Sequence, residues 1–357
     1  MGIDRPVYCT REDVKNALDV AETARANGQV DRAVQAAADS VEGLCHRRFY
    51  PQLATRYFDW PDQYARPWRL WLDDSEVISV TALSSGGTVF NTSEYLLEPN
   101  RTGPPYNRIE INRGTNAGFG GGSSPQRDIT VTGLWGYTNT ESPAGTVTLA
   151  ANATITTLDV SDSSAIGVGQ IIRVGDERML VSERAMVTTA QTLQAPLTAH
   201  KNDQAVTVTT GSAYAVGEVL LLDAERMRIV DITGNQLIVD RAWDGSTLAT
   251  HAGSTIYASR RLTVVRGALG TTAASISLNA AVVAWQPPAA VRELAIAEAV
   301  VDLLQQSSGY ARTTGVGSSA RQVGGGTVAK TEYGVGIGDL RDRTYTSHGR
   351  KVRKRAV

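Results

Sequence analysis

A helix begins late in this 357-residue chain, at Pro287-Pro288-Ala289-Ala290-Val291-Arg292-Glu293-Leu294. Proline can start a helix but cannot continue one, and apolar residues then recur at helical spacing to about Gln306. Two other helix-coding segments open the chain, more than two hundred residues earlier, and the sequence between has β-like character. We therefore expect an α+β fold, in which a small helical core of two N-terminal helices and one late helix carries long β-rich excursions.

The two N-terminal helices have recognisable start signals. Thr10 can cap backbone amides, and Asp13 three residues later suits the positive end of a helix. Asp31 is expected to cap the second helix, which carries one apolar stripe and is expected to close at Phe49-Tyr50-Pro51. These segments supply the first two helices of the core.

The late helix is apolar over an unusually broad face. Two adjacent sides are covered, one by Leu294, Val301 and Leu304 and the other by Ile296, Val300 and Leu303. A helix with so broad an apolar face needs two partners. The second side meets either the β-rich part of the same chain or a neighbouring subunit. In the second case Ile296, Val300 and Leu303 form a subunit interface.

Short β-like runs follow the second helix, separated by turn residues. Gly86-Gly87 is expected to make a hairpin turn, and a glycine-rich stretch at residues 113–127 lacks the lysine and helix of a phosphate-binding loop. The expected strands contain residues 68–72, 77–80, 95–97, 108–111 and 129–132.

An internal repeat lies between residues 143 and 284. The run Val168-Gly169-Gln170-Ile171-Ile172 precedes Glu177-Arg178-Met179, and Val216-Gly217-Glu218-Val219-Leu220 precedes Glu225-Arg226-Met227, at a constant offset of 48 residues. A fragment of the same pattern, Arg241-Ala242-Trp243-Asp244-Gly245-Ser246-Thr247, returns as Arg266-Gly267-Ala268-Leu269-Gly270-Thr271-Thr272. We expect a duplicated small β-barrel or sandwich, with repeats at about 160–208 and 209–260.

The repeat also duplicates several charged residues, which could be mistaken for a catalytic or metal cluster: Glu177, Arg178, His200, Glu225, Arg226 and His251. We interpret them as solvent-facing strand and turn positions, because two histidines without further ligand-spaced residues make a poor metal shell. The four histidines lie in different segments, and no nucleophile motif is visible. The sequence predicts no enzyme, no metal and no cofactor, and an unrecognised active site stays a remote alternative.

The C-terminal part changes character after residue 310. Gly, Ser and Thr dominate, and residues 341–357 carry seven Arg or Lys against one Asp, while the whole chain has a net charge of only −1. We expect an extended arm at residues 313–357 that is either a solvated tail, a hook inserted into a protein partner or a nucleic-acid contact. Its apolar anchors favour a protein partner. The candidate binding residues are Tyr333, Ile337, Leu340, Tyr345, Arg350, Lys351, Arg353, Lys354 and Arg355.

Composition is that of a globular protein, with 42% hydrophobic and 20% charged residues. Cys9 and Cys45 are too few for a disulfide framework and are expected to be buried thiols of a protein made in a reducing cytoplasm. No apolar run approaches the roughly 20 residues of a membrane span. The N-terminus lacks a signal-peptide core, so we expect no membrane partner.

The order of several segments resembles the head-to-tail connector, or adaptor, family of long-tailed phages. The resembling segments are Tyr8 to Val14, the helix running into Cys45-His46-Arg47-Arg48-Phe49, the strand around Tyr95-Leu96-Leu97, the segment that ends with Trp135-Gly136-Tyr137 and the late Pro-x-x-Val-Arg-Glu-Leu-Ala helix. The resemblance covers about residues 1–142 and 285–312. The family passes almost directly from the Gly-Tyr strand to the late helix, so the duplicated β segment is a departure.

The resemblance implies a structural virion protein without catalytic activity, which forms a twelve-subunit ring below the portal of the capsid. Such a ring extends the DNA channel without sequence-specific binding, and it docks a stopper or tail terminator protein at the neck of the particle. The C-terminal arm would reach the portal. A β-rich module that binds carbohydrate or a receptor is the main alternative, with Trp243 and Tyr257 as its candidate aromatic residues.

The predicted organisation has five parts. These are an N-terminal helical part at residues 1–58, a β-rich part at 59–142, the inserted duplicated β-domain at 143–284, the late core helix at 285–312 and the arm at 313–357.

Overall fold

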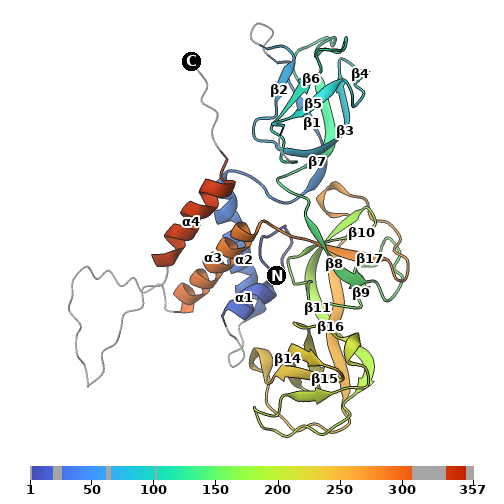
Figure 1. Cartoon of the computed structure of the whole chain (residues 1–357), viewed down its shortest axis with the longest axis vertical. Helices are drawn as coiled ribbons and strands as arrows, with labels where there is room; N and C mark the ends of the chain where they lie inside the picture. The colour runs from blue at the N-terminus through green and yellow to red at the C-terminus, as the bar shows by residue number, and fades with distance from the viewer. Residues whose placement is uncertain (1, 19–25, 62–65, 101–102, 308–334, 351–357) are drawn as a thin grey trace, which may run out of the picture.

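The computed structural model describes residues 2–18, 26–61, 66–100, 103–307 and 335–350. These residues have a mixed α+β fold, as predicted. The helices form a layer on one side of the molecule, and three β lobes are stacked along its long axis (Figure 1). We name the lobes upper, middle and lower after their positions in Figure 1.

The helical layer contains α1 (Arg11–Ala17), α2 (Asn27–Cys45), α3 (Ala289–Ser307) and α4 (Val335–His348). Thr10 and Asp13 form the predicted capping box of α1. The predicted cap of α2 is wrong, because α2 begins one turn earlier and Asp31 lies inside it, where its carboxylate accepts hydrogen bonds from Arg11. The same helix ends at Cys45, since His46 adopts a left-handed conformation with φ of 52°.

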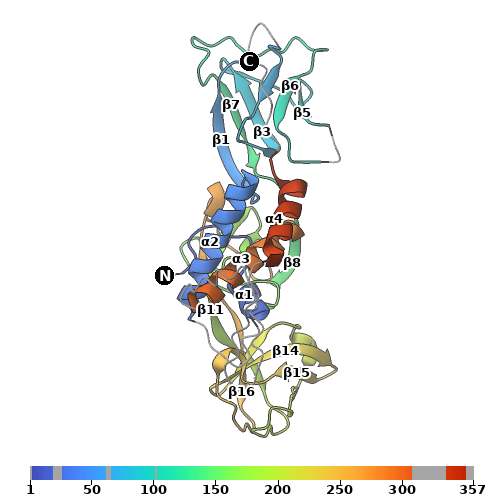
Figure 2. The ribbon, with the colours of Figure 1, turned by 90° about the vertical axis from the view of Figure 1, so that its left-hand side faces the viewer.

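The helix α4 was not predicted, and it corrects the expectation of an arm extended over residues 313–357. Ile337 and Leu340 pack against the buried core of the helical layer, and Thr344, on the same face, is fully buried. The spacing of these three residues matches successive turns of a helix. The polar neighbours and glycines of this segment mask that pattern. Figure 2 shows α2, α3 and α4 side by side.

The upper lobe follows α2 directly. A four-stranded sheet, in the order β1-β7-β3-β4, packs with a three-stranded sheet, in the order β2-β6-β5. Residues 52–58, which the predicted division of the chain placed in the N-terminal helical part, form a strand paired with β7. Gly86-Gly87 makes the predicted turn, between β3 and the short β4. The strands are β1 (Gln52–Phe58), β2 (Arg69–Trp71), β3 (Val77–Ser85), β4 (Thr88–Val89), β5 (Tyr95–Glu98), β6 (Arg108–Ile111) and β7 (Ile129–Trp135).

The middle and lower lobes share one ten-stranded sheet, and two long strands, β11 and β16, run through both. Each lobe nevertheless has its own apolar core. The strands are β8 (Glu141–Thr146), β9 (Thr157–Asp159), β10 (Ile171–Val174), β11 (Glu177–Thr192), β12 (Ala205–Thr207), β13 (Val219–Leu222), β14 (Glu225–Thr233), β15 (Gln236–Asp240), β16 (Thr255–Val265) and β17 (Ala281–Trp285).

The two copies of the repeat are nested, which corrects the tandem arrangement that the sequence predicts. The middle lobe has the order β9-β16-β11-β10-β17-β8, and the lower lobe has the matching order β12-β15-β14-β13-β16-β11. In the lower lobe, the hairpin β14–β15 closes with a tight turn at Gly234. The equivalent hairpin of the middle lobe is β11–β16, and there the whole lower lobe is inserted in place of the turn. The middle lobe is assembled from both flanks of the insertion.

A buried arginine–glutamate pair occupies the same position in both lobes. Arg266 donates to Glu177 through Nε and Nη2 at 2.7 and 2.8 Å, and Arg241 donates to Glu225 through the same atoms at the same distances. In each pair, the amide of the residue after the arginine also donates to the carboxylate. The echo of Arg241–Thr247 in Arg266–Thr272 is therefore the signature of this pair, one per lobe.

The helical layer packs on the middle lobe. Its core includes Val168, Ile171 and Leu180 of that lobe, together with Trp285, which leads into α3. Four N-terminal residues, Ile3, Val7, Tyr8 and Cys9, lie in the same core. The layer and the middle lobe thus form one packed unit, with the other lobes above and below it (Figure 1).

Candidate interaction surfaces

The C-terminal helix α4 lies on α2 and α3 through both apolar and polar contacts. Arg341 donates to Glu298 at 2.8 Å, and the Thr344 hydroxyl donates to the carbonyl oxygen of Ala290 at 3.3 Å. Two predicted portal anchors, Ile337 and Leu340, are half-buried within the chain itself. Tyr345 alone among the described apolar anchors keeps a large exposed fraction, 44%. The predicted anchor Tyr333 lies outside the described residues.

The end of α4 reaches the junction between the helical layer and the upper lobe. The Tyr137 hydroxyl lies 3.1 Å from Nδ1 of His348, and the His348 ring makes edge contacts with Tyr137 and Phe49. Arg350 donates its amide to the carbonyl oxygen of Cys45 and pairs with Asp74 of the upper lobe at 2.6 Å. The predicted basic residues Lys351, Arg353, Lys354 and Arg355 follow in sequence but lie outside the described residues.

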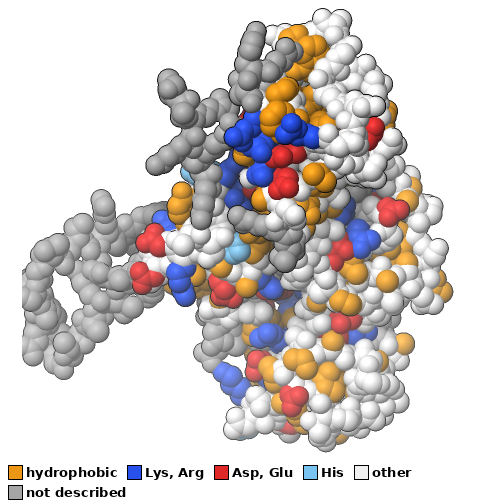
Figure 3. Space-filling view, turned by 45° about the horizontal axis from the view of Figure 1, so that its top comes forward, with side chains coloured by type: hydrophobic (Ala, Val, Ile, Leu, Met, Phe, Trp, Pro, Cys, Tyr) orange, Lys and Arg blue, Asp and Glu red, His pale blue; other side chains and the backbone are white. Residues whose placement is uncertain are grey.

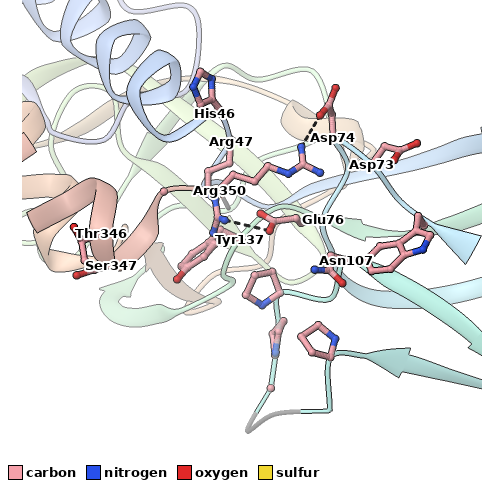
Figure 4. Close-up of a pocket in the computed structure, with 16 residues that line it drawn as sticks. His46, Arg47, Asp73, Asp74, Glu76, Asn107, Tyr137, Thr346, Ser347 and Arg350 are labelled. Carbon is pink, nitrogen blue, oxygen red and sulfur yellow. Dashed lines mark hydrogen bonds and ion pairs between the residues drawn. The ribbon is translucent and has the colours of Figure 1, made fainter. Parts of the chain in front are cut away.

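A cleft of about 760 Å³ opens at this junction. Arg47 lies over the Tyr137 ring and pairs with Glu76 at 3.4 Å, while Nε of Arg47 and Oε2 of Glu76 are buried without a hydrogen-bond partner (Figure 4). Burial raises the pKa of Glu76, although Arg47 opposes this, and burial together with the Arg47 charge lowers the pKa of His348. Figure 3 shows basic side chains next to acidic ones where the upper lobe meets the rest of the molecule.

The predicted subunit interface on α3 is only partly exposed. Leu303 is 2% exposed and belongs to the core of the helical layer, so it is not a surface residue of the single chain. Ile296 and Val300 are half-buried against the same core. The broad apolar face of α3 packs on α1 and α2 and also on α4, a partner that neither sequence-based alternative considered.

Helix α1 connects the helical layer to the middle lobe and to the lower lobe through ion pairs. Arg11 is buried between Asp31 of α2 and Glu183 of β11, and this arginine lowers the pKa of Glu183. Lys15 pairs with Asp244 of the lower lobe at 2.8 Å, with both side chains largely buried. These contacts fix the lower lobe relative to the helices, and sequence analysis missed them because the partners lie up to 229 residues apart.

The duplicated charged residues are not all solvent-facing, which corrects the sequence interpretation. Glu177, Arg178, Glu225 and His251 are buried, whereas His200 and Arg226 are exposed. His251 lies between two carboxylates, with Nδ1 2.7 Å from Asp223 and Nε2 2.9 Å from Glu225. Burial alone would raise the pKa of Glu225, but hydrogen bonds from Arg241 and His251 outweigh it and lower the pKa to about 2. This arrangement stabilises the lobe.

Of the two aromatic residues proposed for a carbohydrate face, one is buried and one is exposed. Trp243 is only 6% exposed and is covered by Arg228, whose guanidinium lies 5.1 Å from the ring centre. Tyr257 is 38% exposed. The lower lobe therefore presents one of the two predicted aromatic residues.

Among the described residues, no three His, Cys, Asp or Glu side chains come together as metal ligands, and none of the described helices is long and apolar enough to cross a membrane. Cys9 and Cys45 are free, buried thiols, as predicted. No protein-family model, curated protein or solved structure matches the chain.

Proposed function

We propose that this chain is a structural head-to-tail connector of a tailed phage, which forms a ring below the portal and docks the tail side of the neck. The observation that carries the proposal is the position of the helical layer. Segments from both ends of the chain, α1 with α2 and α3 with α4, form one layer, and β lobes extend from it in opposite directions (Figure 1). A connector needs two separated docking faces on a rigid centre, and this shape suits that need.

The C-terminal segment supports the portal contact. Arg350 is fixed at the cleft between the helical layer and the upper lobe by its contacts with Cys45 and Asp74. The basic residues that follow it start from this fixed point, so an acidic surface of a portal could bind them by charge attraction that weakens with salt. The resemblance in segment order described above supports the same role.

Truncation tests the proposal. Deleting residues 313–357 would also remove α4 and its contacts with α2 and α3, so deleting residues 351–357 isolates the basic segment. We expect the short truncation to keep the unfolding midpoint of the full chain and to lose binding to the purified portal of the same phage. The control for a general effect of surface charge is Arg127→Ala, which removes one exposed positive charge from the upper lobe, where the truncation removes four. Portal binding of unchanged affinity by the truncated chain would refute the role of the segment.

A further inference from the structure

The middle and lower lobes have the same fold, so a comparison between them shows which surface residues that fold requires. Hydrogen bonds from Val147 to Ala280 and from Ala151 to Ile276 join two segments of the middle lobe. Leu149 and Leu278 lie between these bonds, and they are 63% and 56% exposed. Equivalent bonds in the lower lobe join Leu193 to Ser254 and Leu197 to His251. The residues between them there include Ala195 and Gly253, without a large apolar side chain.

A second pair differs in the same way. Thr157 of β9 pairs with Thr263 of β16, which places Ile155 opposite Val265 when the register is continued by two residues. Both are exposed, at 39% and 44%. In the lower lobe, Ala205 pairs with Ile238, and the same step places Asp203 opposite Asp240. The lower lobe therefore has carboxylates where the middle lobe has apolar side chains.

The four apolar residues belong to one end of the middle lobe. Arg266, which follows Val265, donates to the carbonyl oxygens of Asn152 and Ile155 at 2.8 and 2.7 Å and so holds the 149–155 segment against β16. The lower lobe forms the same fold with small or acidic residues at these positions. The exposed apolar residues of the middle lobe, Leu149, Ile155, Val265 and Leu278, therefore serve something other than folding, and we name them the apolar patch.

A groove with a partly apolar lining lies between α2, α3 and α4. Its volume is about 440 Å³; its apolar lining residues are Ala33, Ala36, Ala37, Val301 and Ile337, and its polar ones are Ser40, Glu298, Asp302, Gln305 and Arg341. Of the three alanines on α2, Ala36 is exposed, and its small side chain allows close approach of an apolar partner. The three helices form the left-hand side of the molecule in Figure 1 and face the viewer in Figure 2, whereas the segments 147–155 and 265–280 lie on the right-hand side of Figure 1.

We propose that the apolar patch of one copy docks in the α2–α3–α4 groove of the next copy. Two unlike surfaces on opposite sides of one subunit give a head-to-tail contact, which closes into a ring when the rotation between copies permits it. This inference rests on the proposed connector function and adds the residues of the subunit contact. The middle lobe, which departs from the family pattern, then forms part of the ring itself.

Photo-crosslinking tests the contact in the full-length protein. Leu278 is replaced by a benzoylphenylalanine residue, and ¹⁴N- and ¹⁵N-labelled copies are mixed, so that mass spectrometry separates crosslinks between copies from those within one. We expect crosslinks between copies to residues 27–45, 289–307 or 335–348. The double substitution Ile155→Asp and Val265→Asp introduces the aspartates that stand at the equivalent positions of the lower lobe. It should lower the yield of crosslinks between copies at least tenfold. Val89→Asp, which changes a 69% exposed valine of the upper lobe, should leave the yield unchanged.

The outcomes separate this inference from the proposed function. Copies that assemble and bind the portal but crosslink elsewhere would refute this contact and leave the connector proposal standing. Crosslinks from position 278 to the groove of the same chain, or to residues 308–334, would likewise refute it. Copies that neither associate with one another nor bind the portal would overturn both.

Discussion

Replacing Arg241 by methionine tests the buried arginine–glutamate pair that the middle and lower lobes each contain. The side chains of Arg241 and Glu225 are both 0% exposed. The substitution removes two hydrogen bonds to the carboxylate and three to the carbonyl oxygens of Thr198, Asp203 and Ala249. Methionine fills much of the same volume, so the loss is mainly that of charge and hydrogen bonds, and Glu225 keeps a buried negative charge.

Removing one partner of a buried ion pair costs about 3–5 kcal/mol. We expect Arg241→Met to lie near the low end, about 3 kcal/mol, because His251 still donates to Glu225. Arg266→Met in the middle lobe should lie near the high end, about 5 kcal/mol, because Ile276 stands at the position equivalent to His251. The control is Arg261→Met, whose partner is Asp159 and whose side chain is 45% exposed, with an expected cost below about 1 kcal/mol.

Urea unfolding measures these differences in the free energy of unfolding, and hydrogen exchange assigns each loss to one lobe. The exchange of β14 and β15 amides should accelerate in Arg241→Met, and that of β10 and β17 amides in Arg266→Met. A buried substitution that costs less than the exposed control, or two variants that weaken the same lobe, would show that the buried pairs do not stabilise one lobe each.

Three further predictions concern the pH dependence, α4 and the nested lobe. Because the pKa of Glu225 is lowered from 4.5 to about 2, the stability that this carboxylate contributes is present above pH 4.5 and is lost as the pH falls toward 2. The unfolding midpoint of Glu225→Gln should therefore fall less than that of the unchanged chain between pH 5 and pH 2.5, and an equal fall would contradict the assignment. Leu340→Asp should detach α4 and raise hydrogen exchange along residues 335–348, while Asp339→Ala, an exposed neighbour, should not; unchanged exchange in Leu340→Asp would show that the apolar contact does not hold the helix. Replacing residues 187–257 by a four-residue turn should leave a folded chain with the middle-lobe core intact, as judged by a cooperative unfolding transition, whereas a molten product would show that the two lobes fold only together.

Local sequence signals predicted local structure well. The Thr10 capping box and the Pro287-Pro288 start of α3 were correct, because neighbouring residues alone determine them. The five predicted strands of the upper lobe are present for the same reason. Asp31 misled the prediction because its carboxylate binds Arg11 of another helix rather than amides of its own.

Long-range topology was harder to predict from the sequence. The offset of 48 residues relates the hairpin β10–β11 to the hairpin β13–β14, and it therefore suggests tandem copies. The outer copy, the middle lobe, is complete only at β17. The second occurrence of the Arg241–Thr247 pattern, after the lower lobe, was the signal that the outer copy resumes there. Glu177 and Glu225 looked solvent-facing because the arginine that pairs with each lies in the turn after another strand, β16 for Glu177 and β15 for Glu225.

The sequence predicted only part of the candidate interaction surfaces. Ile337 and Leu340 were recognised as anchors, but their partner is the helical layer of the same chain. Leu149 and Leu278 carry no sequence motif, and only the equivalent hydrogen bonds of the two nested copies distinguish them from ordinary surface residues. The docking surface that we propose therefore comes from the comparison between the internal copies.

The connector proposal is tested most directly by a cryo-electron-microscopy reconstruction of the neck of the phage particle that encodes this chain. We expect a ring directly below the portal, in which each subunit fits α1 to α4 and the middle lobe of one copy contacts the α2–α3–α4 groove of the next. A neck without this chain, or density for it only at a distant site such as a tail fibre, would rule out the connector role.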